Sequence, residues 1–462
     1  MREKSDSKGL PNGKSRLRLL PAVFLSIILA VLAFTIPAEG LDSNMRGALA
    51  VFMVAAVLWI SEAIPLYLTS FVIVLMEVML IDKGVFSASD ALQPFFNTLI
   101  ALFFGGFVLS IGLNKYGLDA KMARYILSKA GKSPGKILIG MMGMTAFLSM
   151  WMSNTATTAL MMAMALPIYR AIPPGNRFKK ALVLGIPFAA NIGGMGTPIG
   201  TPPNAIIINE LAEGGYNITF FQWMMMTVPV MLVLLAISFV ILFYAFRPEK
   251  NDLPVEDISC EGIRSMDGKQ FYVLGIFVLT AVLWLFSSTK DVKNLFQSSG
   301  IIALIPVIAF FGAGILDKRD LRKVNWDVLL LMGGGMSLGS AVKATSLDIW
   351  IMGHIDHSSM SFFVLVLVFA LAAILLSTFM SNTSTAALMA PIVLTVAVLS
   401  SNPIGMMVAL ALACSMAMAL PVSTPPNAIA YGTEEVEVKD MMIYGSLIGA
   451  LGVLVILIFL AF

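Results

Sequence analysis

The feature that most constrains this 462-residue chain is a succession of apolar runs, most of them long enough to cross a lipid bilayer as a helix. A helix needs about 20 predominantly apolar residues to span the hydrocarbon core. Only 12% of the residues are charged, whereas soluble proteins carry about 25%. This composition predicts an all-α polytopic membrane protein. It excludes a soluble enzyme, a disordered chain and a nucleic-acid-binding protein.

Eleven uninterrupted apolar runs predict transmembrane helices. They occupy 19–37, 45–61, 64–81, 95–113, 180–213, 223–246, 270–287, 298–316, 327–343, 404–433 and 441–462. Two further apolar stretches, 136–172 and 361–400, are each interrupted near the middle by Ser-Asn-Thr. Each of these fits either two spans or one re-entrant hairpin, and both alternatives leave the parity of the topology unchanged.

Basic residues orient the chain in the membrane. If the N-terminus lies in the cytoplasm, 25 of the 30 Lys and Arg residues fall in segments that face inward. Cytoplasmic loops retain positive charge, so this distribution predicts a cytoplasmic N-terminus and an external C-terminus in the plasma membrane. The run 19–37 is long for a cleavable signal and lacks a small-x-small cleavage site, so we expect it to remain as the first helix.

Two motifs recur in the same order in both halves of the chain. Leu148–Thr155 shares six of its eight residues with Leu376–Thr383. Further on, Thr-Pro-Pro-Asn-Ala-Ile occurs at Thr201–Ile206 and again at Thr424–Ile429. The two motifs recur at nearly constant separations, 228 and 223 residues. Such regular recurrence indicates a duplicated unit.

The duplicated units are predicted to be inverted, because the charge distribution gives the spans before the two hairpins opposite directions. Inverted repeats with interrupted helices are typical of secondary transporters, whose binding sites lie near the middle of the bilayer. The expected segments are a cytoplasmic N-terminal segment 1–18, a first helix 19–44, repeat 1 over 45–246 with its hairpin at 136–172, a cytoplasmic linker 247–269, and repeat 2 over 270–462 with its hairpin at 361–400.

The interruptions concentrate polar groups where the surroundings are apolar, and buried polar groups need partners. Each proline removes a backbone donor and breaks a continuous helix. Freed carbonyls, Ser hydroxyls and Asn oxygens suit a hard monovalent cation, while helix N-termini attract anions. No acidic residue stands beside either Ser-Asn-Thr, so a cation and an anion bound together would neutralise each other in part. The alternatives are hydrogen bonds between helices for Ser-Asn-Thr and simple kinks for the prolines.

At these motifs the chain resembles the divalent-anion:sodium symporter family of dicarboxylate, citrate and sulfate carriers, and most closely its bacterial sodium-dependent dicarboxylate members. The resemblance covers essentially the whole chain. It implies a homodimer in the bacterial inner membrane, surrounded by lipid. It also implies that each protomer has a scaffold domain and a transport domain that moves as an elevator, with two opposed hairpins that meet at the substrate.

By motif match, the resemblance also implies particular site residues. Sodium site 1 would use Ser149, Ser153, Asn154 and a backbone carbonyl near Gly200. Sodium site 2 would use Ser377, the carbonyl of Met380, Asn382 and a carbonyl near Ser423. The substrate carboxylates would meet Asn154, Thr155, Asn382, Thr383 and the turns Thr201-Pro202 and Thr424-Pro425. Ser423 stands where the first repeat has Gly200, so the carbonyl of the second sodium site stays open.

The expected function is therefore inward symport of sodium with a C4 dicarboxylate such as succinate, malate or fumarate. A sodium-independent dicarboxylate exchanger and a sulfate or citrate carrier remain alternatives, and an ion channel is a weaker one. The sequence shows no nucleophile–base set that would indicate an enzyme. Glu77, inside the run 64–81, is a proton-linked group, a side chain that snorkels to the interface, or a partner in scaffold packing.

Overall fold

The computed structural model describes residues 13–173, 175–249, 253, 266–354 and 361–460, which form helices and connecting turns without a strand. The first half contains α1 Gly13–Thr35, α2 Ser43–Ser61, α3 Leu66–Leu80, α4 Ala88–Leu92, the 3-10 helix η1 Gln93–Phe96, α5 Thr98–Lys115, α6 Leu118–Ala130, α7 Pro134–Ser149, α8 Asn154–Ala171, α9 Phe178–Gly194, α10 Pro202–Glu213 and α11 Phe220–Ala245. The second half contains α12 Gly268–Leu285, α13 Lys290–Phe296, α14 Ser299–Ile302, α15 Leu304–Gly312, α16 Lys318–Leu321, α17 Trp326–Ala344, α18 Leu347–Gly353, α19 Phe362–Phe379, α20 Asn382–Ala397, α21 Pro403–Cys414, α22 Pro425–Tyr431 and α23 Val438–Leu460.

Six helices of the described chain are long and apolar enough to cross a membrane. They are α2, the continuous stretch from α4 to α5, α11, α12, α19 and most of α23. A seventh candidate is the pair Lys290–Phe296 and Ser299–Gly312, which meet at 70°. Several other predicted spans are helical but shorter, such as the 15-residue α3. The helical membrane class is thus confirmed, whereas the number of eleven spans stays a prediction.

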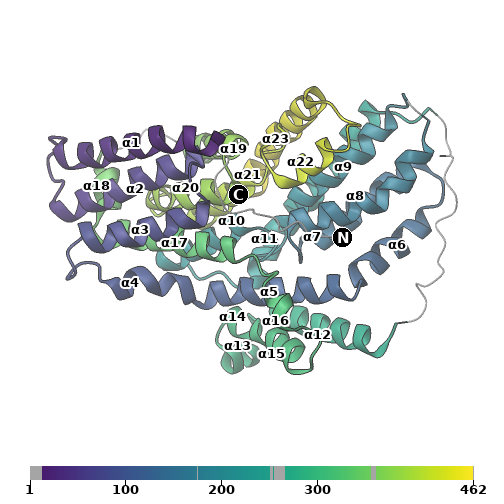
Figure 1. The fold of residues 1–462 in the computed structure, drawn as a ribbon, viewed down its shortest axis with the longest axis horizontal. Coiled ribbons are helices and arrows are strands. Elements are labelled where there is room, and N and C mark those ends of the chain that lie inside the picture. The colour runs from purple at the N-terminus through teal and green to yellow at the C-terminus, as the bar shows by residue number, and fades with distance from the viewer. Residues whose placement is uncertain (1–12, 174, 250–252, 254–265, 355–360, 461–462) are drawn as a thin grey trace.

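The two interrupted stretches form helix pairs, α7 with α8 and α19 with α20 (Figure 1). The segment after each pair is a broken helix: α9 and α10 flank residues 195–201, and α21 and α22 flank residues 415–424. Proline explains where the second half of each broken helix begins. Thr201 and Thr424 have extended backbones, and two prolines follow each of them in the first helical turn, where their missing N–H groups cost nothing.

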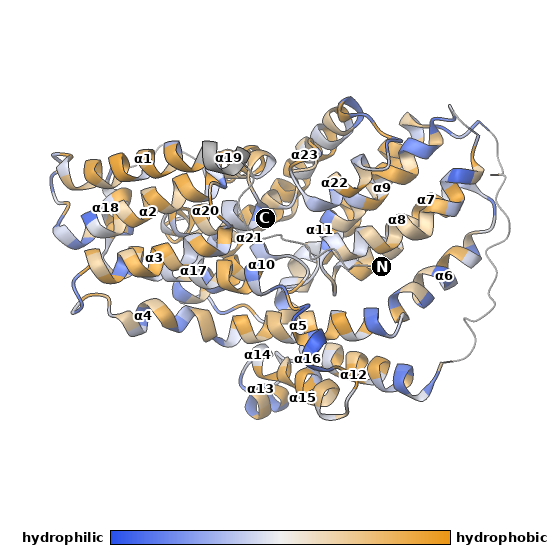
Figure 2. Ribbon diagram, viewed as in Figure 1, coloured by the Kyte–Doolittle hydropathy of each residue, from blue (hydrophilic) through white to orange (hydrophobic). Residues whose placement is uncertain are grey.

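The helices that lead into the two breaks are buried on nearly all sides. Every residue of α9 from Ala181 to Gly194 is buried, as is every residue of α21 from Gly405 to Cys414. A helix that is apolar all round belongs inside a protein or a membrane. Most residues of the helices are hydrophobic, and hydrophilic ones gather toward helix ends and loops (Figure 2). The helices that lead into the breaks therefore lie inside the protein, and residues 195–201 of the first break are buried as well.

The structure leaves some predicted segments outside the described residues. They include residues 1–12 of the N-terminal segment and residues 250–252 and 254–265 of the linker. The predicted division into two repeats joined by a linker therefore stays a prediction.

Candidate binding site

The first hairpin has a polar tip between α7 and α8. Ser153 caps α8, since its Oγ accepts a hydrogen bond from the N–H of Ala156 at 3.2 Å. Ser149, the last residue of α7, donates from Oγ to Asn154 Oδ1 at 2.7 Å. Ser149 Oγ also lies 2.8 Å from the carbonyl oxygen of Ala190. These hydrogen bonds satisfy polar groups that would have no partner in lipid, and they hold the Asn154 side chain at the tip.

The second hairpin repeats this arrangement between α19 and α20. Ser381 Oγ accepts a hydrogen bond from the N–H of Ser384 at 3.0 Å, and Ser377 Oγ donates to Asn382 Oδ1 at 3.0 Å. In both tips a serine binds the asparagine five residues further along. Because the pair recurs in separate parts of the chain, the local motif itself builds the tip.

Each broken helix is held open by the asparagine of its Thr-Pro-Pro-Asn motif. Asn204 Nδ2 donates to the carbonyls of Gly194, at 3.0 Å, and Thr197, at 2.8 Å. Asn427 Nδ2 likewise donates to two carbonyls in the break 415–424, both at 3.0 Å. The carbonyls of Thr197 and Leu420 also accept hydrogen bonds from the N–H groups of Gly200 and Ser423, and the asparagine donors add to these turns. The asparagines therefore stabilise the non-helical backbone.

Each break is also joined to the hairpin tip of its own repeat. Thr197 Oγ1 donates to the carbonyl of Met150 at 2.5 Å, and Ser423 Oγ donates to the carbonyl of Thr378 at 3.0 Å. A tip and a break thus form one hydrogen-bonded unit in each half of the chain.

The two units border one cavity of about 740 Å³. Eleven of the fourteen predicted site residues line it: Ser153, Asn154, Thr155, Gly200, Thr201 and Pro202 from the first unit, and Asn382, Thr383, Ser423, Thr424 and Pro425 from the second. The other three, Ser149, Ser377 and Met380, are buried behind the lining. The structure thus brings both predicted sets together, while the ligands assigned to them stay predictions.

The opposite wall of the cavity was not anticipated from the sequence. It comes from α3, α5 and α17, with Tyr67, Phe103, Phe107 and Asp327 among its residues. These positions belong to neither repeated motif, so no sequence signal marked them. A smaller cavity of about 190 Å³ shares part of the lining and continues to the exposed Lys323. The large cavity therefore opens toward the loop that precedes α17.

Sequence reasoning also missed three asparagines. Asn204 and Asn427 stood in the repeated motif itself, which was a usable signal. Asn191 in α9 is fully buried, lines the cavity and donates from Nδ2 to Thr424 Oγ1 at 3.3 Å, which joins the two units. At the offset of 223 residues its counterpart is Cys414, so the repeat comparison gave no indication of it. A lone asparagine inside an apolar run was the remaining clue.

The lining of the central cavity carries little charge. Among the described residues that line it, Asp327 is the one charged side chain. Nowhere in the described chain do three or more His, Cys, Asp or Glu residues gather in a way that would hold a metal ion. Neutral hydroxyl, amide and carbonyl oxygens suit a monovalent cation, and the N-termini of α8, α10 and α20, which border the cavity, favour an anion. The arrangement suits a cation and an anion bound together.

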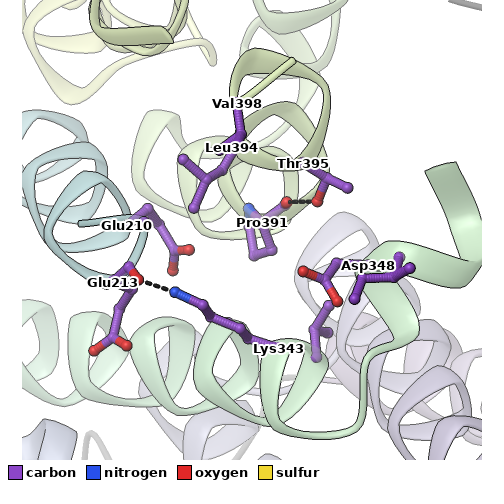
Figure 3. A pocket seen from close by; sticks show the side chains of 12 residues that line it. Glu210, Glu213, Lys343, Asp348, Pro391, Leu394, Thr395 and Val398 are labelled. Atoms are coloured by element: carbon purple, nitrogen blue, oxygen red, sulfur yellow. Dashed lines mark hydrogen bonds between the residues drawn. The ribbon is translucent and has the colours of Figure 1, made fainter. Parts of the chain in front are cut away.

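A second, more charged cavity lies at the far end of α10 (Figure 3). It measures about 250 Å³ and contains the carboxylates of Glu210, Glu213 and Asp348 beside the ammonium of Lys343. Lys343 donates to the Glu213 carbonyl, at a helix C-terminus where a cation is stabilised. The 12-residue α10 begins in the first cavity and ends in the second, so it connects them.

Glu77 lies outside both cavities. It is fully buried in α3, and Ser337 of α17 donates to its Oε2 at 2.6 Å. This contact joins α3 to α17, in agreement with the packing alternative for Glu77.

These features define a helical membrane protein with a central binding cavity. Residues 17–462 match the family described as the sodium:sulfate symporter transmembrane region, and the chain belongs to this family. The family resemblance of the repeated motifs is thereby confirmed. The protein is a multi-pass membrane transporter rather than an enzyme.

Similar proteins agree with this assignment. An uncharacterized transporter of Haemophilus influenzae is 33% identical over 453 residues, which cover 95% of this chain and 94% of the relative. The sodium-dependent dicarboxylate transporter SdcS of Staphylococcus saprophyticus is 32% identical, over 95% of this chain and 89% of its own.

Two solved structures share the fold. MtrF of Neisseria gonorrhoeae, described with a class of antimetabolite efflux pumps, gives a TM-score of 0.58 at 13% identity, over 98% of this chain and 95% of its own. The YdaH transporter of Alcanivorax borkumensis gives 0.59 at 11% identity, over 97% of both chains. At these identities the likeness shows the fold alone.

Proposed function

We propose that this protein is a sodium-coupled symporter that carries C4 dicarboxylates such as succinate, malate or fumarate into the cell. The observation that carries the proposal is the central cavity, where both hairpin tips and both helix breaks present neutral oxygens and helix N-termini. Family membership and a relative named as a sodium-dependent dicarboxylate transporter support the same ions and substrate class.

Sodium ions, as co-transported substrates, would bind at the two tips. Ser149, Ser153, Asn154 and the Gly200 carbonyl would form one site, and Ser377, Asn382 and the carbonyls of Met380 and Ser423 the other. The buried Oδ1 of Asn191 and of Asn204, neither of which has a hydrogen-bond partner among the described residues, are further acceptors in these regions. A carboxyl group that follows sodium would accept hydrogen bonds from Thr155, Thr383 and the N–H groups at the starts of α8 and α20.

Charge explains why the two substrates would travel together. An isolated dianion inside a bilayer is poorly solvated, and so is an isolated sodium ion. Two sodium ions and one dianion are neutral as a set, which lowers the cost of moving the loaded site through an apolar region. Empty or partly loaded forms would therefore move slowly.

The two walls of the cavity suggest how the movement would occur. We assign the tips and breaks to a transport domain, and α3, α5 and α17 to a scaffold against which it slides as an elevator. Residues 45–246 and 270–462 would form the inverted repeats, joined by the linker 247–269. The protein would be a homodimer in a bacterial inner membrane, with its N-terminus in the cytoplasm and its C-terminus outside.

Uptake of labelled succinate into proteoliposomes tests the proposed function. With an inward sodium gradient we expect saturable uptake that falls at least tenfold when potassium or choline replaces sodium. Equal rates without sodium would contradict symport and favour exchange. Competition at fixed pH by sulfate or citrate that exceeds that of succinate would change the substrate class, and single-channel conductance would indicate a channel.

A further inference from the structure

An apolar groove runs between α6 and α7, away from the central cavity. It has a volume of about 430 Å³. Met122, Tyr125 and Ile126 line it from α6, and Ile139, Gly143 and Phe147 line it from α7. Four of these side chains are 40–53% exposed. Apolar surface of this extent is unfavourable in water, so the groove is a surface for an apolar occupant.

Three lysines stand at one end of the groove, and we call them the lysine triad: Lys129, Lys132 and Lys136. Lys129 follows Tyr125 by one helical turn, and its Nζ lies 5.6 Å from the centre of the Tyr125 ring. Lys136 precedes Ile139 by three residues, on the same face of α7. Lys132 lies in the turn between the two helices.

Within the described part of the chain, no carboxylate pairs with the triad. All three side chains are exposed, and none forms an ion pair with another described residue. The turn that carries Lys132 belongs to a segment that the charge distribution places on the cytoplasmic side, where lipid headgroups meet water. An apolar groove that ends in three exposed ammonium groups, none ion-paired to a described residue, is complementary to an acyl chain with an anionic headgroup.

We propose that this groove binds an anionic phospholipid, with an acyl chain between α6 and α7 and the phosphate among the lysine triad. The position gives the lipid a structural consequence. The helix α6 joins α5, a wall of the central cavity, to α7, the first helix of the first hairpin. A lipid in the groove would bridge α6 and α7 and stabilise their relative position.

Glycine provides a way to fill the groove without disturbing the fold. A Cβ added at Gly143 would meet no atom within 4 Å, so a larger side chain there projects into open space. Gly275 in α12 is equally open and offers a matched control. We therefore compare Gly143→Leu with Gly275→Leu, and Lys129→Gln/Lys132→Gln/Lys136→Gln with Lys290→Gln/Lys293→Gln, whose two lysines are exposed on α13.

The test uses the full-length protein in detergent, with dioleoylphosphatidylglycerol, dioleoylphosphatidylcholine or inorganic phosphate added. Native mass spectrometry measures bound lipid, and thermal unfolding measures stabilisation. We expect phosphatidylglycerol to bind at least ~10-fold more tightly than phosphatidylcholine, because each lysine near the headgroup adds to the attraction. Both groove variants should lose this preference, and both controls should keep it.

Other occupants would give different results. Equal binding of the two lipids, or an unchanged preference in the triad variant, would overturn the proposal. If inorganic phosphate stabilised the protein as well as phosphatidylglycerol did, the site would be for phosphate alone. If Gly143→Leu changed the mass of the oligomer while lipid binding persisted, a second copy of the chain would be the occupant, and the proposal would fail.

Discussion

At the residue scale, the asparagines at the two hairpin tips carry the most specific prediction. Asn154 and Asn382 each accept a hydrogen bond from a buried serine and each line the cavity. We expect Asn154→Ala or Asn382→Ala to remove a ligand oxygen and the contact that orders the tip. Each lost hydrogen bond is worth about 1 kcal/mol, so each loss should weaken binding roughly fivefold. Sodium-dependent succinate uptake and its sodium dependence measure the effect.

A matched control tests whether any change near a tip has this effect. Thr378 lies close to the second tip, but its Oγ1 donates within its own helix to the Ile374 carbonyl and does not line the cavity. Thr378→Ala should keep near-normal uptake. Full sodium-dependent uptake by either asparagine variant would show that the site is assigned wrongly.

Replacing either asparagine of the breaks, Asn204 or Asn427, is expected to lower the stability of the folded protein. Asn204→Ala removes the side-chain donor to the Gly194 and Thr197 carbonyls, of which Thr197 keeps a hydrogen bond from the Gly200 N–H. An unsatisfied buried group costs about 1–3 kcal/mol. We expect a lower unfolding temperature in detergent, and the same for Asn427→Ala. Asn97→Ala, which removes a helix cap outside the breaks, is a control for general destabilisation. If sodium stabilised Asn204→Ala as strongly as the wild type, the side chain would have no part in a cation site.

At the element scale, α5 and α14 touch through their backbones. A Cβ at Gly300 would lie 1.9 Å from the Thr98 carbonyl oxygen, and one at Gly105 would lie 2.1 Å from that of Ala303. Backbone cannot yield as a flexible side chain can, so Gly300→Ala and Gly105→Ala should each destabilise the protein by at least ~1–3 kcal/mol. Gly275→Ala meets no atom within 4 Å and should be neutral or stabilising. Yields of folded protein and unfolding temperatures separate these outcomes.

The loop before α17 is attached to α5 by a pH-dependent ion pair. Burial raises the pKa of Asp320, but hydrogen bonds from Lys115 and Lys323 outweigh it and lower the pKa from 3.8 to about 2. A depressed carboxyl pKa stabilises the folded state above pH 4, and this stabilisation disappears as the pH falls from about 4 to 2.

We therefore expect Asp320→Asn to destabilise the protein at pH 7 by roughly 1–2 kcal/mol, since solvent around the partly exposed Lys115 and the exposed Lys323 weakens the pair. The difference from the wild type should vanish toward pH 2. Asp291→Asn, on the exposed face of α13, should change little at any pH. Unfolding by denaturant at several pH values measures both variants, and a pH-independent difference would contradict the role of the charge.

The repeated elements were predictable because they are built locally. A serine cap, a Ser–Asn pair and a Pro-Pro start need only neighbouring residues, so identical motifs implied identical tips and breaks. The opposite wall depends on how α3, α5 and α17 pack, and no motif records that packing. The run 298–316 shows the same limit. Its composition does not record that Ser299–Gly312 meets the preceding α13 at 70°, where Gln297 adopts a positive φ of 60°.

At the scale of the whole molecule, the cavity is open on one side. It continues past Asn325 toward Lys323, in the loop 317–326 that carries four basic residues. The charge distribution predicts that this loop is cytoplasmic. The second cavity, beside α18, lies at the opposite end of α10. On the proposed orientation, the central cavity therefore opens toward the cytoplasm, and the second cavity lies on the outer side.

Cysteine labelling tests this orientation together with alternating access. In a background with Cys260→Ser and Cys414→Ala, Ala159→Cys places one thiol in the cavity, on the exposed surface of α8. A membrane-impermeant maleimide should react with it in inside-out vesicles and not in right-side-out vesicles. Ile349→Cys, exposed beside the second cavity, should react in the opposite preparation.

Sodium with succinate should slow the labelling of Ala159→Cys in inside-out vesicles, because the loaded site moves outward part of the time. Reaction of Ala159→Cys from both sides at once would indicate a continuous pore, and labelling unaffected by either substrate would contradict alternating access.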